Sequence, residues 1–480
     1  MRRALFALLA ACGADPVFVQ PVYDEPVPED VEAVARGLDA LTLSVAHAGS
    51  VQDLVSLSFS PGETVELANV PFDNDLVVHL SGRIGGGDVA YGRTCVFGLS
   101  AGGPVPEPHL FFSRSVKFAT LPFATPVRTG GLAVTFTDGS ALIAGGANAA
   151  GTANRTLERF DPRTGARTEI ATLGARVGAV AAMLGGDLAL IGGAADGGGA
   201  DFVEIIDADD PASTRVSSVA DTRLAMARIE LTATTLTDGR IVAIGGRPPG
   251  SPAIAPSGAI AEIAVVSGAA EIRELRATLA HPRAGHTATR LGDDVGAPVL
   301  IVGGFGPGAK PVEVAELWKP LSGELANPVT FAPKMKVPRR FHQARLMPDG
   351  SLLIVGGLDG AGQPVRTLER FTIDEGFVIV GELPDDAGVL DFTATTLPDG
   401  RVVLAGGRLD AADTIGVDSA FIARLDVIDG ALDVVATDKL ATRRAGHQAT
   451  LLCDGTVLVT GGTAAESPAE RYNPPLLGRR

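Results

Sequence analysis

Seven Gly-Gly doublets recur along this 480-residue chain, and each one ends an apolar run. The doublets are Gly145-Gly146, Gly192-Gly193, Gly245-Gly246, Gly303-Gly304, Gly356-Gly357, Gly406-Gly407 and Gly461-Gly462. Their first glycines lie 47, 53, 58, 53, 50 and 55 residues apart. A period of about 50 residues in a strand-rich chain is typical of a β-propeller, in which each repeat is one four-stranded sheet. The spacing therefore predicts an all-β chain with one sheet for each doublet.

Each repeat carries further strand signals on both sides of its doublet. An Asp-Gly pair precedes the apolar run at Asp138, Asp238, Asp349, Asp399 and Asp454. Asp-Gly between two apolar runs predicts a tight hairpin with a type I′ turn, which needs positive φ at both central residues. A third strand follows the doublet, as in LERFDP (157–162) and AERYNP (469–474). The doublet glycines are then structural, because they adopt backbone conformations that a Cβ disfavours.

Three repeats begin with Arg-x-x-His, at Arg283–His286, Arg339–His342 and Arg444–His447, and the third strand carries Glu with an aromatic residue two positions later. With the doublets, this pattern resembles the kelch repeat over about residues 116–480. Two departures are that the kelch tryptophan of the fourth strand is missing and that four repeats lack the histidine. Gly131, Ala179, Leu231 and Phe392 occupy that position in the other four repeats.

The resemblance implies a seven-bladed kelch-type β-propeller over residues 115–480. Six blades would require one doublet to be accidental, so seven are favoured. The last repeat supplies only three strands, whereas residues 115–122 (SVKFATLP), before the first repeat, have the character of a fourth strand. We expect this segment to complete the last blade, which would join the two ends of the ring and leave no open sheet edge.

The N-terminal part divides into three segments. Residues 31–113 contain short alternating strands separated by polar turns, which predicts a small β-sandwich of loosely immunoglobulin-like type. Residues 12–30 are rich in proline and acid and are expected to form a tether. Residues 1–11 (MRRALFALLAA) have the basic start and short apolar core of a signal peptide.

Cys12 follows Leu9-Ala10-Ala11, which resembles the lipobox of bacterial lipoprotein signal peptides. The resemblance implies cleavage before Cys12 and lipidation of this cysteine, and several acyl chains together anchor a protein stably. Gly13, rather than Asp, after the cysteine favours the outer membrane by resemblance to lipoprotein sorting rules. An ordinary secretory signal is the alternative. We expect an exported protein of the bacterial cell envelope that faces the periplasm or the cell surface.

The bulk chemistry excludes one class of partner and sets an expectation for the cysteines. A formal net charge of −16, without a basic cluster, argues against nucleic-acid binding. Cys95 and Cys453 are framed by apolar or small residues. Because three cysteines do not make a disulfide framework and free cysteine is commonly buried, two buried thiols are favoured over a bridge between them.

Galactose oxidase and similar radical-copper oxidases are kelch-like propellers, and the resemblance raises the question of a copper site. Such a site requires a cysteine-linked tyrosine, a second tyrosine and two histidines. The tyrosines here are Tyr23, Tyr91 and Tyr472, and no repeat combines two of them with two histidines. We therefore predict no copper site, no other metal site and no cofactor.

The remaining candidate chemical groups follow the repeat. His286, His342 and His447 occupy one repeat position, so we interpret them as packing within their own sheets, with the preceding Arg and the third-strand Glu as partners. Convergence of the three histidines on a metal is the alternative. A glutamate recurs on the third strand at Glu158, Glu204, Glu262, Glu316, Glu369 and Glu470. A catalytic carboxylate pair should break the repeat, so these glutamates are interpreted as partners of the repeat arginines.

The function predicted from these observations is non-catalytic binding. Irregular loops follow the doublets at 247–262, 305–316 and 408–420 and suit contacts with an unknown protein or glycan on one propeller face. Contact with the membrane is expected only through the lipid anchor. Two alternatives remain, a carbohydrate-binding or carbohydrate-active propeller and an envelope assembly factor. An aromatic content of 5% weighs against a glycan platform.

Overall fold

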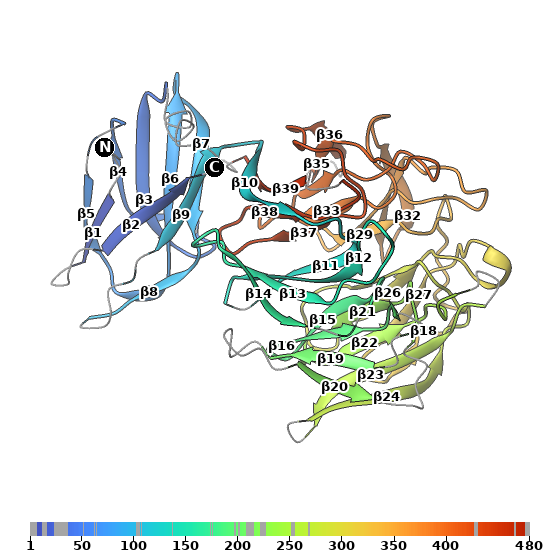
Figure 1. Cartoon of the computed structure of the whole chain (residues 1–480). Helices are drawn as coiled ribbons and strands as arrows, with labels where there is room; N and C mark the ends of the chain where they lie inside the picture. Colours follow the sequence, from blue (N-terminus) through green and yellow to red (C-terminus); the bar gives the residue numbers. More distant parts are fainter. Residues whose placement is uncertain are drawn as a thin grey trace.

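The computed structural model describes residues 7–11, 17–23 and 37–475, apart from gaps at 51, 62, 64, 102–105, 107, 137, 173, 175, 196–197, 200–201, 208–215, 221–226, 251–254, 267–268, 427–430 and 465–466. Within these residues the protein is all-β, with seven four-stranded antiparallel, blade-like sheets and one larger N-terminal sheet (Figure 1). A two-stranded hairpin, β17 (Ala194–Ala195) with β18 (Gly198–Gly199), and a 3-10 turn, η1 (Pro307–Ala309), complete this part of the chain. No helix in the described residues could cross a membrane.

Sheets 1 to 3 follow one another along the chain, and their strands are hydrogen-bonded in sequence order. Sheet 1 contains β11 (Thr129–Thr135), β12 (Ala141–Ala147), β13 (Thr156–Phe160) and β14 (Arg167–Thr172). Sheet 2 contains β15 (Val180–Leu184), β16 (Asp187–Ile191), β19 (Phe202–Ile206) and β20 (Val216–Ala220). Sheet 3 contains β21 (Thr232–Thr235), β22 (Ile241–Ile244), β23 (Ala259–Val266) and β24 (Ala269–Thr278).

Sheets 4 to 6 repeat this order, whereas sheet 7 borrows a strand from before sheet 1. Sheet 4 contains β25 (Thr287–Arg290), β26 (Val299–Val302), β27 (Glu316–Lys319) and β28 (Glu324–Leu325). Sheet 5 contains β29 (Gln343–Leu346), β30 (Leu352–Val355), β31 (Thr367–Thr372) and β32 (Gly376–Glu382). Sheet 6 contains β33 (Thr393–Thr396), β34 (Val402–Ala405), β35 (Ala420–Leu425) and β36 (Leu432–Ala436). Sheet 7 contains β37 (Gln448–Leu451), β38 (Val457–Thr460), β39 (Ser467–Asn473) and β10 (Lys117–Thr125), in that order in space.

The apolar runs before the doublets form the second strand of each sheet, and their side chains pack against both neighbouring sheets. In β26 and β30 all four residues are buried. Seven apolar clusters each combine residues of two adjacent sheets. One of them joins Leu458 and Ala469 of sheet 7 to Ile143 and Phe160 of sheet 1. Burying one such Val, Leu or Ile side chain stabilises the fold by roughly 1.5–3 kcal/mol, so the main stabilising contacts lie between sheets.

The Gly-Gly doublets lie where each second strand ends. Both glycines of every doublet have positive φ, between 58° and 103°. In each sheet the second glycine donates its N–H to a backbone carbonyl of the next sheet in sequence. The seven acceptors, in order, are Arg176, Arg228, Arg283, Arg339, Val389, Arg444 and Arg128. The seventh bond, from Gly462 to Arg128 at 2.9 Å, therefore runs from sheet 7 to sheet 1.

The Asp-Gly turns differ from the type I′ turns predicted from the sequence. The glycine has positive φ in all five, with values of 80° to 85°, but the aspartate does not. The aspartate side chain instead accepts the backbone N–H two residues later, as Asp349 does from Ser351 at 2.9 Å. This local hydrogen bond holds the turn with only one residue in the left-handed region.

The N-terminal sheet has nine strands in the order β4-β3-β6-β7-β9-β2-β1-β5, with β8 paired to β6. These strands are β1 (Ala7–Ala11), β2 (Val17–Tyr23), β3 (Ala40–His47), β4 (Asp53–Phe59), β5 (Val65–Val70), β6 (Asp73–Ile84), β7 (Gly87–Thr94), β8 (Phe97–Leu99) and β9 (His109–Arg114). The two end strands, β4 and β5, contact each other, so the sheet curls around one apolar core. β1 and β2 come from the segments predicted as signal peptide and tether, and Cys12 lies outside the described residues.

The N-terminal sheet lies beside sheet 7 (Figure 1) and is joined to it covalently. Cys95 and Cys453 form a disulfide with their Cα atoms 4.9 Å apart, so the prediction of two free thiols is wrong. The bridge spans 358 residues of sequence, and only the packing of the two sheets brings the cysteines together. Nearby, the Arg471 guanidinium lies 3.9 Å from the centre of the Phe111 ring, and the Asn473 amide donates to the Ser113 carbonyl.

Candidate functional site: the central cavity and its rim

The first strands of all seven sheets line one cavity of about 840 Å³. The middle of each first strand is an alanine, such as Ala288, Ala344 and Ala394, and threonines or glutamines flank it in most sheets. Small side chains at this position allow the first strands to approach one another closely. The cavity wall is therefore made of methyl groups, hydroxyl groups and amides, and two arginines, Arg290 and Arg345, interrupt it.

The three repeat histidines do not converge, and their partners differ from those predicted. Each histidine Nε2 is hydrogen-bonded to a threonine hydroxyl of the preceding sheet. The pairs are Thr232–His286 (3.1 Å), Thr287–His342 (2.9 Å) and Thr393–His447 (3.0 Å). The prediction of partners within the same sheet is wrong, because the first strands lie closer to one another than to their own third strands. Among the described residues, these histidines do not form a group that could hold a metal.

All three histidines are buried and therefore neutral. Burial, reinforced by the positive charge of Arg339, lowers the pKa of His342 to about 3. Burial beside Arg444 lowers the pKa of His447 to about 3 as well. Burial also lowers the pKa of His286 well below its usual value. A neutral, buried imidazole that is already bonded to a hydroxyl serves as a connector between sheets.

The predicted pairing of repeat arginines with third-strand glutamates is confirmed in five sheets. The pairs are Arg128–Glu158 (2.6 Å), Arg176–Glu204 (2.9 Å), Arg283–Glu316 (2.6 Å), Arg339–Glu369 (2.7 Å) and Arg444–Glu470 (2.6 Å). All ten side chains are buried, and the arginines also donate to backbone carbonyls such as that of Gly356. These carboxylates are used to neutralise buried guanidinium groups.

Sheets 3 and 6 depart from this pairing. In sheet 3, Glu262 lies opposite Val242 on the neighbouring strand. The position that carries glutamate in the five paired sheets corresponds to the one opposite Ala243, and Ala261 occupies it. Glu262 accordingly binds Arg240 and Arg273, so its assignment to the repeat is wrong. In sheet 6 both members of the ion pair are replaced. Val389 and Phe421 occupy the two positions and are buried in the apolar cluster between sheets 5 and 6.

The rim of the cavity is formed by the residues that immediately precede the histidine position. These seven rim residues are Gly130, Gly178, Glu230, Gly285, Phe341, Asp391 and Gly446. All have positive φ, from 50° to 68°. Backbone hydrogen bonds link neighbouring members, for example from Phe341 N–H to the Gly285 carbonyl at 2.9 Å. Four are glycine, as the backbone conformation favours, and three are not.

The three exceptions each contact the first residue of a loop that follows a doublet. Glu230 forms two hydrogen bonds of 2.8 Å with Arg247, and Asp391 pairs with Arg408. Phe341, which is 36% exposed, packs edge-to-face on Phe305. A non-glycine residue in the left-handed region costs about 1–3 kcal/mol and persists mainly at functional sites. The rim thus carries three varied side chains, with Phe341 and Asp391 exposed and Glu230 half-buried, at positions where the repeat favours glycine.

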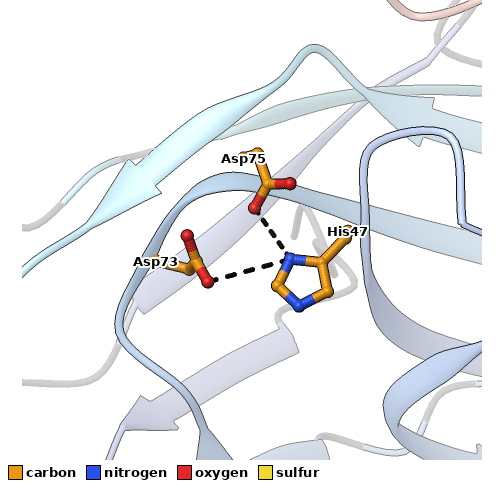
Figure 2. A group of neighbouring side chains, drawn as sticks. All are labelled: His47, Asp73 and Asp75. Atoms are coloured by element: carbon orange, nitrogen blue, oxygen red, sulfur yellow. Dashed lines mark hydrogen bonds and ion pairs between the residues drawn. The ribbon is translucent and has the colours of Figure 1, made fainter.

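A second group of chemical interest lies on the N-terminal sheet (Figure 2). His47 Nδ1 is 2.7 Å from Asp75 Oδ1 and 3.9 Å from Asp73 Oδ2. The hydrogen bond that His47 donates to the Asp75 carboxylate raises the pKa of His47; the two aspartates are exposed and the histidine is half-buried. Potential ligand atoms of these residues lie within 4.8 Å of one another. Sequence reasoning missed this group, although Asp73 and Asp75 are two residues apart on one strand and therefore share a face.

The side chains of Tyr91 and Tyr472 have different hydrogen-bond partners. Tyr91 hydrogen-bonds to His79 on the N-terminal sheet, whereas Tyr472 hydrogen-bonds to Thr437 within the core beside sheet 6. Burial raises the pKa of Tyr472 to about 12. The Tyr23 side chain lies outside the described part of the structure. No family model matches the chain, and no match was found among curated proteins.

Proposed function

We propose that this chain is an exported, lipid-anchored envelope protein whose seven sheets form a closed kelch-type propeller, and that it acts as a non-catalytic binding scaffold. In this proposal the propeller supplies a rigid frame, and the rim and its adjoining loops contact the partner. The N-terminal sheet, which includes residues 17–23 of the predicted tether, lies between the frame and the anchor. The single observation that carries the binding role is the clustering of repeat-breaking side chains on the rim.

Three features support a closed propeller. The cycle of doublet hydrogen bonds returns from sheet 7 to sheet 1. An apolar cluster is shared between those two sheets, as between every other adjacent pair. β10 pairs with β39, so the chain before sheet 1 completes sheet 7. A ring closed in this way leaves only the short outermost strands of the sheets as edges.

The disulfide supports export. Disulfides persist in oxidising compartments such as the bacterial periplasm and are rare in the cytosol. Cys95 and Cys453 together with the signal-like residues 1–11 therefore favour the same compartment. The Cys12 anchor can be tested separately. Cys12→Ser should release the protein from the membrane fraction, and unchanged membrane association would remove the lipid anchor from the proposal.

The binding role is supported by the contrast between the rim and the rest of the repeat. The histidines, arginines and glutamates that follow the repeat are buried in contacts between or within sheets. Glu230, Phe341 and Asp391 break the repeat, carry unfavourable φ and adjoin the irregular loops. Selection for stability alone would favour glycine here, so these side chains are best explained by contact with another molecule.

The test compares the wild-type protein with a variant in which two rim residues are returned to the repeat's own glycine, Glu230→Gly with Asp391→Gly. Relief of backbone strain should offset the loss of the two arginine pairs, so the variant should fold with unfolding free energy within about 1 kcal/mol of wild type. Asp374→Gly, which removes the carboxylate of an exposed aspartate in the turn between β31 and β32, is the matched control. Envelope extract is passed over all three immobilised proteins. A protein or glycan retained by wild type and control but lost from the rim variant supports the proposal, and equal retention by all three contradicts it.

A further inference from the structure

The central cavity carries positive charge that the repeat does not require. The side chain three residues after the histidine position is threonine in four sheets, at Thr234, Thr289, Thr395 and Thr450, but arginine in sheet 5, at Arg345. One position further along, sheet 4 has Arg290 where sheet 3 has Thr235. Both arginines line the cavity and belong to adjacent sheets. No acidic side chain is present among the described residues that line it.

The structural role of Arg345 is one that a threonine performs elsewhere. In sheet 3 the Thr234 hydroxyl donates to the Ala288 carbonyl of the next sheet at 2.9 Å. Arg345 makes the equivalent contact, donating from Nε (2.8 Å) and Nη2 (2.5 Å) to the Ala394 carbonyl. Its Nη1 donates to the Ala344 carbonyl at 2.7 Å. Since a guanidinium has five N–H groups, two remain beyond these three bonds. Arginine at this position therefore adds N–H donors and a positive charge, although a threonine hydroxyl is enough to make the contact with the next sheet.

Arg345 has only backbone carbonyls as hydrogen-bond acceptors within the described residues, whereas the repeat arginines of five sheets are paired with carboxylates. Arg290 is bonded to Asp293, whose side chain is almost fully exposed. Burial lowers the pKa of Arg345 to about 10, so the guanidinium is charged at neutral pH. Arg345 is half-buried in the cavity wall, and a partly desolvated charge without a counter-charge is costly, so the cost is offset when an anion binds.

Neighbouring polar side chains also provide hydrogen-bond donors for an anion. Gln343 lies two residues before Arg345 on β29 and therefore projects on the same face of the strand. Thr289, at the aligned position of sheet 4, also lines the cavity. His447 is the remaining titratable group in the lining, and it is neutral because burial beside Arg444 lowers its pKa to about 3. The wall around Arg345 thus offers N–H and O–H donors and no described negative charge.

We propose that the cavity binds a small oxyanion, a phosphate, sulfate or carboxylate group, with Arg345 as the main ligand and Arg290 as a second cation. Guanidinium groups match planar and tetrahedral oxyanions through paired N–H donors. Binding at this position is independent of the rim, so it extends the function beyond the scaffold role.

The test measures binding of inorganic phosphate, sulfate and acetate by calorimetry at constant ionic strength. Wild type is compared with Arg345→Thr, which installs the residue of four other sheets and keeps the contact to Ala394. Lys334→Thr removes the same charge from an exposed side chain and is the control. Loss of one charged hydrogen-bonding group should weaken binding about ten- to a hundredfold in Arg345→Thr and leave it unchanged in the control. A preference for phosphate or sulfate over acetate would assign the site to a tetrahedral oxyanion, and the reverse to a carboxylate.

Two results would overturn the proposal. One is an absence of saturable binding of all three anions to wild type, and the other is equal binding by wild type and Arg345→Thr. Unfolding curves show whether Arg345→Thr is folded. If it is not, Arg290→Thr, which installs the residue of sheet 3, replaces it and should weaken binding in the same direction. Unchanged affinity in that folded variant would also count against the site.

Discussion

Sheets 5 and 6 are neighbours with the same four-strand order, but they fill one position of their cores with opposite chemistry. Sheet 5 buries Arg339 and Glu369 as an ion pair whose side chains are fully inaccessible. Sheet 6 buries Val389 and Phe421 at the aligned positions. In both sheets the second doublet glycine of the preceding sheet donates its N–H to a backbone carbonyl, that of Arg339 for sheet 5 and that of Val389 for sheet 6. The comparison shows that buried side chains must fill these two positions and that the backbone must supply a carbonyl acceptor for the doublet glycine. A charged pair is not essential at these positions.

The largest expected effect comes from breaking the ion pair in sheet 5 from one side. Glu369→Ala leaves the Arg339 guanidinium buried without its counter-charge, and it removes the acceptor of the Lys336 and Val337 N–H groups. We expect a loss of about 3–5 kcal/mol of unfolding free energy, measured by urea denaturation. The matched substitution in sheet 6, Phe421→Leu, removes no charge and should cost less than about 1.5 kcal/mol. Equal losses in the two sheets would contradict the comparison.

The second prediction concerns the doublets, which do not differ between the two sheets. A Cβ on Gly357 would lie 2.5 Å from the Arg340 carbonyl oxygen, and one on Gly407 would lie 2.5 Å from the Phe392 Cβ. Both glycines have strongly positive φ. We expect Gly357→Ala and Gly407→Ala to cost about 2–4 kcal/mol each.

Gly362 is the control for backbone strain alone, because its φ is +79° and a Cβ there would meet open space. Gly362→Ala should cost about 1 kcal/mol. Thermal or urea unfolding of the three variants would establish the order. A doublet variant as stable as the loop variant would show that close packing at the doublet is not required.

The smallest predicted effect near neutral pH is a dependence of stability on pH that sheet 5 has and sheet 6 lacks, and it grows as pH falls. The folded pKa of His342 is about 3, far below the value near 6.5 of an unfolded histidine. The unfolded state therefore binds an extra proton between these values, and stability falls as pH falls from about 6.5 toward 3. The slope is about 1.4 kcal/mol per pH unit for each such histidine.

His342→Phe tests this slope, because sheet 6 already has Phe392 at the aligned position. Unfolding free energies measured between pH 7 and pH 4 should decline less steeply in the variant, by one proton. His447→Phe should reduce the slope by the same amount. A slope unchanged in either variant would mean that folding does not lower the pKa of the histidine.

The repeated sheets could be predicted from the sequence because each pattern that predicts them lies within a short segment. The doublets and the apolar runs recur once in every repeat, the arginine–glutamate pairs recur in five of the seven sheets, and a repeated position has a similar environment in each sheet. Glu262 shows the limit of that reasoning. It lies one residue out of register, and only the strand pairing reveals that it faces the other way.

Contacts between sheets could not be predicted from the sequence in the same way. The Cys95–Cys453 bridge depends on how the N-terminal sheet packs on sheet 7, and no sequence spacing encodes it. The histidine partners could in principle have been predicted. Each lies in the preceding repeat, where a threonine occupies the same position of the first strand in all three cases. The rim was not predicted, although glycine at four of its seven positions is a signal for positive φ; Glu230 and Phe341 carry no such signal in their residue type.

The central claim is that the arginine–glutamate pair is one structural unit that an apolar pair can replace. The most direct measurement is a double-mutant cycle of Arg339→Val and Glu369→Phe, which transplants the pair of sheet 6 into sheet 5. We predict that the double variant is more stable than either single variant, with a coupling energy of about 1–3 kcal/mol from urea unfolding. A double variant destabilised by the full sum of the two single losses would contradict the claim.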